Sequence, residues 1–373
     1  MTRKYTSVAV IALMVAGLAG SAMADGARIT SFGMIELAPA EGKGGGGGGG
    51  GGGKPGGNDG GGTDPAFPYY SWMHPDLPGV WDLGFTGAGS TITFVDDFDP
   101  KTATMVDIDL NMDGVIEWMP HGWAVNAFGQ FVAPESTRVQ FQYDNTATVA
   151  LTAGLDVINL SFGLMTESRL YEDDWIISGN HVLEADIIRL ANIDTTLSMA
   201  EDTAVIVKAA GNGGLLGQGG EIGTQVGGST FGFVDVLGYD LIGAPNVIFA
   251  GALEANGTIH KRRGAQGTLA SYSDHPGNNL QTREQYLVVG VDSSKMVAAG
   301  TSFAAPIISS YAAILGHKFS DENSGAAPGA TQVVNRLLDT ARTDTIRNYD
   351  PYYHGQGEAS ISRAVAPDWI SGG

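Results

Sequence analysis

The segment GTSFAAP, residues 300–306, places a Thr-Ser pair among small residues at the start of an apolar stretch. Its glycine permits a tight backbone before Thr301, and its two alanines are small enough to let a helix lie close to a sheet. Pro306 is tolerated because the N–H groups of the first helical turn have no intrahelical partner. The apolar residues that follow predict a helix over Phe303–Phe319, with Ser302 at its start.

Short apolar segments rich in β-branched residues predict strands that are buried on both faces. They alternate along the chain with segments of helical character, and this alternation indicates an α/β domain with a mostly parallel sheet between two layers of helices. The predicted strands are Thr91–Val95, Val157–Leu160, Ala204–Lys208, Val247–Ala250 and Tyr286–Val289. Besides Phe303–Phe319, the predicted helices are Ala124–Phe128, Leu183–Leu190 and Thr331–Ala341.

Four polar residues follow strands or begin helices in this pattern: Asp96, His121, Asn212 and Ser302. In a parallel sheet the chemistry lies at the carboxyl ends of the strands. A serine hydroxyl becomes a nucleophile when an imidazole takes its proton, and a carboxylate fixes the tautomer of that imidazole. A side-chain amide can then stabilise an oxyanion, although Gly211-Asn212-Gly213 is also a common turn sequence. The four residues therefore supply the groups that nucleophilic catalysis needs.

In this order of residues, and in GTSFAAP, the chain resembles the subtilisin-like serine proteases (subtilases), whose catalytic order is Asp, His, Ser. The likeness covers roughly residues 80–365 and includes DVINLSFG at 156–163, ASYS at 270–273 and YHGQG at 353–357. It implies a subtilisin-like three-layer fold and a serine endopeptidase. The implied triad is Asp96, His121 and Ser302, with Asn212 as oxyanion donor and Ser161, Phe162 and Gly163 in the substrate-pairing strand.

Two blocks depart from the family pattern. His121 is followed by Gly122-Trp123-Ala124 rather than by Gly-Thr-His, and we expect the bulky Trp123 to reshape a substrate subsite. Asp96 is followed by Asp97 rather than by Ser or Thr and then Gly. Strand register favours Asp96 as the triad carboxylate, while Asp97 is an alternative orienting carboxylate or a cation ligand.

These departures leave one rival function open, a non-catalytic binding protein on a subtilase scaffold. An esterase of the α/β-hydrolase class is disfavoured, because its G-x-S-x-G elbow would need glycine where Ala304 stands.

The composition argues against several classes of binding partner and of chemistry. The 373 residues carry 20 Lys and Arg against 40 Asp and Glu, a formal charge of −20, which argues against nucleic acid and against electrostatic attachment to a membrane. There is no cysteine, so disulfides, thiolate metal sites and a cysteine nucleophile are excluded. We expect polypeptide substrates, a monomer, and catalysis that requires no cofactor or metal.

The N-terminus predicts export. Arg3 and Lys4 precede an apolar run over Val8–Leu18 and an A-x-A site ending at Ala24, which is typical of a signal peptide over residues 1–24, although an uncleaved anchor is the alternative. Residues 25–63 are expected to form a glycine-rich tether and residues 64–373 the catalytic domain. The mature protein would be secreted or periplasmic.

The segment DLNMDG, residues 109–114, has the opening of a calcium loop, but Pro120 stands where the twelfth position needs a carboxylate. Apolar alternation over Met105–Ile108 and Val115–Trp118 instead favours a β-hairpin closed by Asp113-Gly114. A structural calcium ion here is the alternative.

Overall fold

The computed structural model of the chain describes residues 67–143, 149–163, 165–171, 174–177, 203–213, 219–222, 226–227, 231–257 and 266–367. The predicted signal peptide, the predicted tether and the helix predicted over Leu183–Leu190 lie outside these residues. Within them, no helix combines the length and the apolar character needed to cross a membrane.

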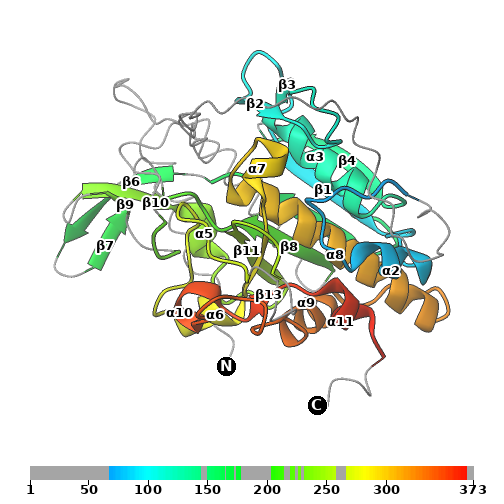
Figure 1. Cartoon of the computed structure of the whole chain (residues 1–373). Helices are drawn as coiled ribbons and strands as arrows, with labels where there is room; N and C mark the ends of the chain where they lie inside the picture. Colours follow the sequence, from blue (N-terminus) through cyan, green and yellow to red (C-terminus); the bar gives the residue numbers. More distant parts are fainter. Residues whose placement is uncertain are drawn as a thin grey trace.

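A seven-stranded sheet forms the centre of the domain, and every neighbouring pair of its strands is parallel (Figure 1). Each of the five predicted strands lies in this sheet and is one to three residues longer than predicted. From one edge to the other the order is β13 (Gly357–Glu358), β12 (Tyr286–Gly290), β11 (Val247–Leu253), β8 (Ala204–Ala209), β5 (Asp156–Leu160), β1 (Thr91–Asp96) and β4 (Thr137–Gln142).

Helices cover both faces of the sheet, as the sequence predicted. On one face α3 (His121–Val132), α8 (Thr301–Glu322) and α9 (Ala330–Asp339) pack on strand residues such as Phe94 and Val207. On the other face, residues at and after α5 (Val236–Asp240) pack with the intervening residues, such as Val95 and Ile206. Successive side chains along a strand point to opposite faces, so each strand contributes to both cores.

The three longer helices are confirmed: α3 and α8 are wider than predicted, and α9 begins one residue earlier and ends two residues earlier. α3 begins at His121 rather than Ala124 because Pro120, with φ −53° and ψ 140°, lies immediately before it as its N-cap. Six short helices among the described residues escaped prediction, because segments of four to six residues are too short to show helical periodicity. They are α5 and, besides it, α2 (Leu77–Asp82), α6 (Leu280–Glu284), α7 (Ser293–Met296), α10 (Pro351–His354) and α11 (Ile361–Val365).

A second, antiparallel sheet was not predicted. It extends from one side of the domain, at the left of Figure 1, in the order β7-β6-β10-β9. Its strands are β6 (Met165–Tyr171), β7 (Asp174–Ile177), β9 (Val226–Gly227) and β10 (Phe231–Asp235).

The predicted hairpin is present, but its closing turn is not. β2 (Met105–Ile108) pairs antiparallel with β3 (Glu117–Pro120), so residues 109–116 form a loop in place of a tight turn at Asp113-Gly114. Side chains inside the loop determine its shape: Asp109 Oδ2 accepts from the N–H of Gly114 at 3.0 Å, and Asp113 Oδ1 from that of Val115 at 2.8 Å. These hydrogen bonds satisfy backbone groups that a longer strand pairing would otherwise use.

The sheet reverses its strand order at β1. After β1 the chain adds β4 on one side and then returns to add β5 on the other. The carboxyl end of β1, where Asp96 lies, is therefore a topological switch point, the position at which α/β sheets open a crevice for ligands.

Candidate active site

Asp96 is the last residue of β1 and its carboxylate is buried, with 3% of the residue exposed. Its Oδ1 and Oδ2 lie 3.0 and 3.1 Å from Nδ1 of His121. Oδ1 also accepts from the backbone N–H of Asp97 at 2.8 Å, which fixes the orientation of the carboxylate.

Asp97, the alternative carboxylate, points elsewhere. Its Oδ1 accepts from Gln142 Nε2 at 2.8 Å, and also from Thr102 Oγ1 and the N–H of Asp99. The structure thus brings His121 to Asp96 and engages Asp97 in the loop that follows β1.

His121 is the first residue of α3 and follows β3 directly. Its N–H donates to the carbonyl of Thr104 at 2.8 Å, and its ring lies 5.7 Å, centroid to centroid, from Phe303. Since Nδ1 faces a carboxylate, the proton belongs on Nδ1 and the lone pair on Nε2. Nε2 is buried and has no hydrogen-bond partner in the described part of the chain. It is therefore free to accept a proton.

Ser302 lies in the first turn of α8, and Gly300, two residues before it, leaves space open beside its hydroxyl. Gly300 has φ +144°, and a Cβ built on it would lie 3.0 Å from Ser302 Oγ and 3.2 Å from Asn212 Nδ2. The hydroxyl and the amide nitrogen therefore face the same small space, which only glycine keeps free.

Asn212, beyond the end of β8, is held by the residue before Ser302. Its Oδ1 accepts from both the N–H and the Oγ1 of Thr301 at 2.9 Å. Thr301 Oγ1 in turn accepts from the N–H of Gly211 at 3.1 Å. Because Oδ1 is occupied, Nδ2 remains to donate to a ligand, beside the N-terminus of a 22-residue helix.

Residues Ser161, Phe162 and Gly163 follow β5 and are buried beside the site. Ser161 Oγ donates to the carbonyl of Ser302 at 2.8 Å and accepts from Asn159 Nδ2 at 2.9 Å. Asn159 Oδ1 accepts at 3.1 Å from Oγ of Ser309, which lies about two turns further along α8 than Ser302. This chain of buried hydrogen bonds fixes the first turn of α8 to β5.

The sequence reasoning missed Thr301, Asn159 and Ser309 as supports of the site. Thr301 stands inside the GTSFAAP segment, so its proximity to Ser302 was a usable signal. Nothing local distinguishes Asn159 or Ser309 from other polar residues, because their contacts join elements far apart in the sequence.

A parallel α/β sheet with Asp96, His121 and Ser302 in chain order at its switch-point edge defines the class of subtilisin-like serine peptidases. The sequence matches the model of the subtilase family over residues 130–357, more than half of the chain, and the chain therefore belongs to the subtilase family. The matched range includes Asn212 and Ser302. Asp96 and His121 precede it and are joined to the site by the fold.

Known proteins are similar to parts of the chain. Mycosin-5 of Mycobacterium tuberculosis (strain ATCC 25618 / H37Rv) is 37% identical over 102 residues, which are 26% of this chain and 16% of that protein. The prenylagaramide maturation protease PagA shows 18% identity and a TM-score of 0.46, covering 78% of this chain and 98% of its own. MycP1 from Mycobacterium smegmatis shows 18% identity and a TM-score of 0.46, covering 81% and 86%.

Proposed function

We propose that the chain is an exported serine endopeptidase that cleaves polypeptides through an acyl-enzyme intermediate, with Asp96, His121 and Ser302 as its triad. The observation that carries this proposal is the shared space above Gly300, which Ser302 Oγ and Asn212 Nδ2 both face. A peptide carbonyl placed there would meet a nucleophile on one side and a hydrogen-bond donor on the other.

The chemistry follows from which atoms are free. Ser302 Oγ attacks the carbonyl carbon while its proton passes to His121 Nε2, and Asp96 stabilises the resulting imidazolium. The carbonyl oxygen, now negative, accepts a hydrogen bond from Asn212 Nδ2. The intermediate collapses as His121 donates the proton to the leaving amine, which breaks the peptide bond and leaves an ester on Ser302. Water, deprotonated by His121, then attacks this ester, and His121 returns the proton to Ser302 Oγ as the bond to the acyl group breaks and the acid is released. No step uses a cofactor.

The substrate is a polypeptide bound beside β5. The buried segment Ser161–Gly163 lies next to Ser302, where an extended peptide could pair with its backbone. Trp123 is 47% exposed in the first turn of α3, two residues from His121, and it would form part of a substrate subsite.

Reaction of the purified protein with a fluorophosphonate probe, combined with casein and short-ester assays, tests the function. We expect Ser302 to be labelled and casein to be cleaved, and Ser302→Ala to abolish both while leaving the circular dichroism spectrum unchanged. Labelling without hydrolysis of any polypeptide, or full activity in Ser302→Ala, would contradict the proposal. A folded protein that binds peptides with neither labelling nor turnover would support the binding-protein alternative.

Export rests on residues 1–24, which lie outside the described part of the chain. The intact mass of the secreted protein should place the mature N-terminus at Asp25, and its mass by light scattering should be that of a monomer. A membrane-embedded form that retains residues 1–24 would contradict cleavage.

A further inference from the structure

The segment 271–275 packs along the stretch of chain that carries Asn212. The N–H of Asp274 donates to the carbonyl of Gly211 at 2.8 Å. The N–H of His275 donates to the carbonyl of Gly220 at 2.8 Å, and that of Gly219 donates to the carbonyl of Ser271 at 3.0 Å. This segment therefore contacts the stretch of chain that carries Asn212 at several points.

The side chain of Asp274 reaches the same stretch. Its Oδ1 accepts from the N–H of Gly213 at 3.0 Å and from the N–H of Gly220 at 2.6 Å. Gly211 and Gly213 have φ of +121° and +71°, values that glycine adopts readily. Two such residues on either side of Asn212 leave its backbone free to shift unless other groups hold it. Asp274 holds both neighbours, Gly211 through its backbone and Gly213 through its carboxylate.

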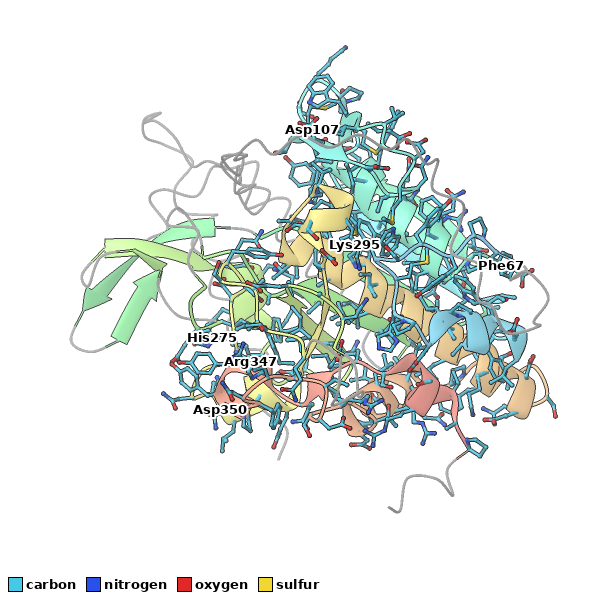
Figure 2. The ribbon with its side chains drawn as sticks, in the orientation of Figure 1. Phe67, Asp107, His275, Lys295, Arg347 and Asp350 are labelled. Atoms are coloured by element: carbon cyan, nitrogen blue, oxygen red, sulfur yellow. The ribbon has the colours of Figure 1, made fainter. Side chains whose placement is uncertain are left out.

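Asp274 is itself held firmly. Its carbonyl accepts from Tyr286 Oη at 2.7 Å and from Ser273 Oγ at 3.1 Å, and Ser273 Oγ accepts from the N–H of Ala252 at 3.1 Å. Tyr286 is fully buried in β12, and a Cβ on Gly251 of β11 would collide with its hydroxyl. The ring of His275, the next residue (Figure 2), lies 5.0 Å, centroid to centroid, from the ring of Tyr352 in α10. Through these contacts, buried groups of the central sheet hold Asp274, and Asp274 in turn holds the residues on either side of Asn212.

We propose that Asp274 is a positioning residue for the oxyanion donor: its carboxylate fixes the backbone of Gly213, directly after Asn212, and so keeps Nδ2 directed at the space beside Ser302 Oγ. This inference rests on the proposed function. It goes beyond it by assigning a role to a residue that takes no part in the proton transfers.

The hydrogen-bond acceptor, rather than the negative charge, carries this role. Burial raises the pKa of Asp274 to about 7, although the hydrogen bonds from the N–H groups of Gly220 and Gly213 and the charge of Lys208 act to lower it. Lys208 is itself paired with Asp235, with Nζ 2.8 Å from Oδ2. Oδ1 can accept from the two backbone N–H groups whether or not the carboxyl is protonated. An asparagine, which retains that oxygen, should therefore substitute for Asp274.

Steady-state kinetics on two substitutions test the role. We expect Asp274→Ala to lower kcat by about 10- to 100-fold, with KM changed less than about threefold, because a misplacement of catalytic groups by about 1 Å costs on this order. Asp274→Asn should retain kcat within about threefold. A loss in a folded Asp274→Asn variant equal to that in Asp274→Ala would overturn the proposal.

A double-mutant cycle separates positioning from a general loss of structure. If Asp274 acts through Asn212, Asp274→Ala should cause no further loss of kcat in an Asn212→Ala background. The same fold-loss in both backgrounds would overturn the proposal. If Asp274→Ala fails to fold, the cycle is run with Asp274→Glu, which keeps the carboxylate but displaces its oxygens, and the same outcomes apply.

Glu358 provides a matched control. It is also a buried carboxylate that accepts from a glycine N–H, that of Gly257 at 2.9 Å, but it lies on β13 at the far edge of the sheet. Glu358→Ala should lower the melting temperature and leave kcat unchanged. If the wild-type protein showed no turnover that Ser302→Ala abolishes, the proposed function itself would be refuted. Turnover with additive losses in the cycle would refute only the role of Asp274.

Discussion

At the scale of single residues, each reactive side chain has one atom occupied by the protein and one left free. His121 uses Nδ1 on Asp96 and keeps Nε2; Asn212 uses Oδ1 on Thr301 and keeps Nδ2. Because the occupied atom fixes the tautomer or the amide orientation, the free atom is a defined acceptor in the first case and a defined donor in the second. The protein scaffold thus sets the direction of both the proposed proton transfer and the proposed oxyanion hydrogen bond.

The two adjacent aspartates allow a direct test of the triad. Asp96→Asn should lower kcat by about 10⁴-fold, since an amide beside Nδ1 favours the wrong tautomer of His121. Asp97→Asn makes the same charge change one residue away, where the side chain contacts Gln142 and Thr102, and should alter kcat less than about threefold. Peptidase assays on both variants decide the matter, and the reverse pattern would assign the triad carboxylate to Asp97.

Gly300 should not tolerate even alanine. The added methyl would lie 3.0 Å from Ser302 Oγ and 3.2 Å from Asn212 Nδ2, at a φ of +144° that side chains rarely adopt. We expect Gly300→Ala to lower kcat at least about 100-fold. Gly329→Ala is the control, because Gly329 also precedes a helix but has φ −68° and no atom within 4 Å of the added methyl. Similar kcat values for the two variants would show that the space above Gly300 is not used by substrate.

Local sequence could indicate the position of candidate reactive residues more readily than the residues that hold them. The position of Ser302 at the start of a helix was predictable because its small neighbours and the apolar stretch that follows are local features. Ser161 was expected to bind substrate, yet its hydroxyl holds the carbonyl of Ser302, a contact between β5 and α8 that no local pattern encodes. The roles of Ser161–Gly163 toward a substrate stay a prediction.

At the scale of elements, the junction between β3 and α3 delivers His121 to the site. β2 and β3 were predictable from their alternation, but the loop 109–116 was not. Its Asp and Asn side chains bind backbone N–H groups within the loop, and this competes with continued strand pairing. The residue spacing could indicate the hairpin. It could not show whether the backbone N–H groups of residues 109–116 would pair between the strands or bind side chains within the loop.

Catalysis should be independent of metal ions. We expect a chelator to leave kcat unchanged, because Asp96, His121, Asn212 and Ser302 complete the proposed reaction without one. Activity assays with EDTA, and after addition of calcium, provide the measurement, and a loss that calcium restores would contradict this expectation.

A calcium-dependent melting temperature would be a separate result. If Asp113→Asn removed this dependence while Asp107→Asn, on β2 (Figure 2), did not, the loop 109–116 would be a structural cation site.

At the scale of the whole molecule, the strands that could be predicted from the sequence are those that are buried on both faces. β5, β8, β11 and β12 are buried throughout and appear in the sequence as short apolar runs. β4, with the sequence TRVQFQ, is an edge strand with no fully buried residue, so it lacks that signal. Edge strands and short helices take their structure from the neighbours they pack against, which local sequence does not identify.

Stability should depend on pH through buried carboxyls. Burial raises the pKa of Glu358 from 4.5 to about 7. Between these two values the folded state retains a proton that the unfolded state has lost, so the contribution of Glu358 to stability is greatest below pH 4.5 and is lost as the pH rises through about 7. Glu358→Gln mimics the protonated form and should raise the free energy of unfolding at pH 8, by at most about 3 kcal/mol at about 1.4 kcal/mol per pKa unit.

Denaturant unfolding of wild type and Glu358→Gln across pH tests this prediction. The difference between the two proteins should shrink as the pH falls toward 4.5. A difference that is the same at every pH would show that Glu358 is not protonated in the folded state near neutral pH.

The strand order also governs when the chain can first act during its synthesis. β1, which carries Asp96, is the first strand of the sheet along the chain, whereas Ser302 follows β12, so six of the seven strands are made before the proposed nucleophile exists. Contacts between such distant segments form late and slowly in folding. We therefore expect an incomplete or unfolded chain to be inert toward the proteins around it. The time taken to fold acts as a delay that separates translation from proteolysis.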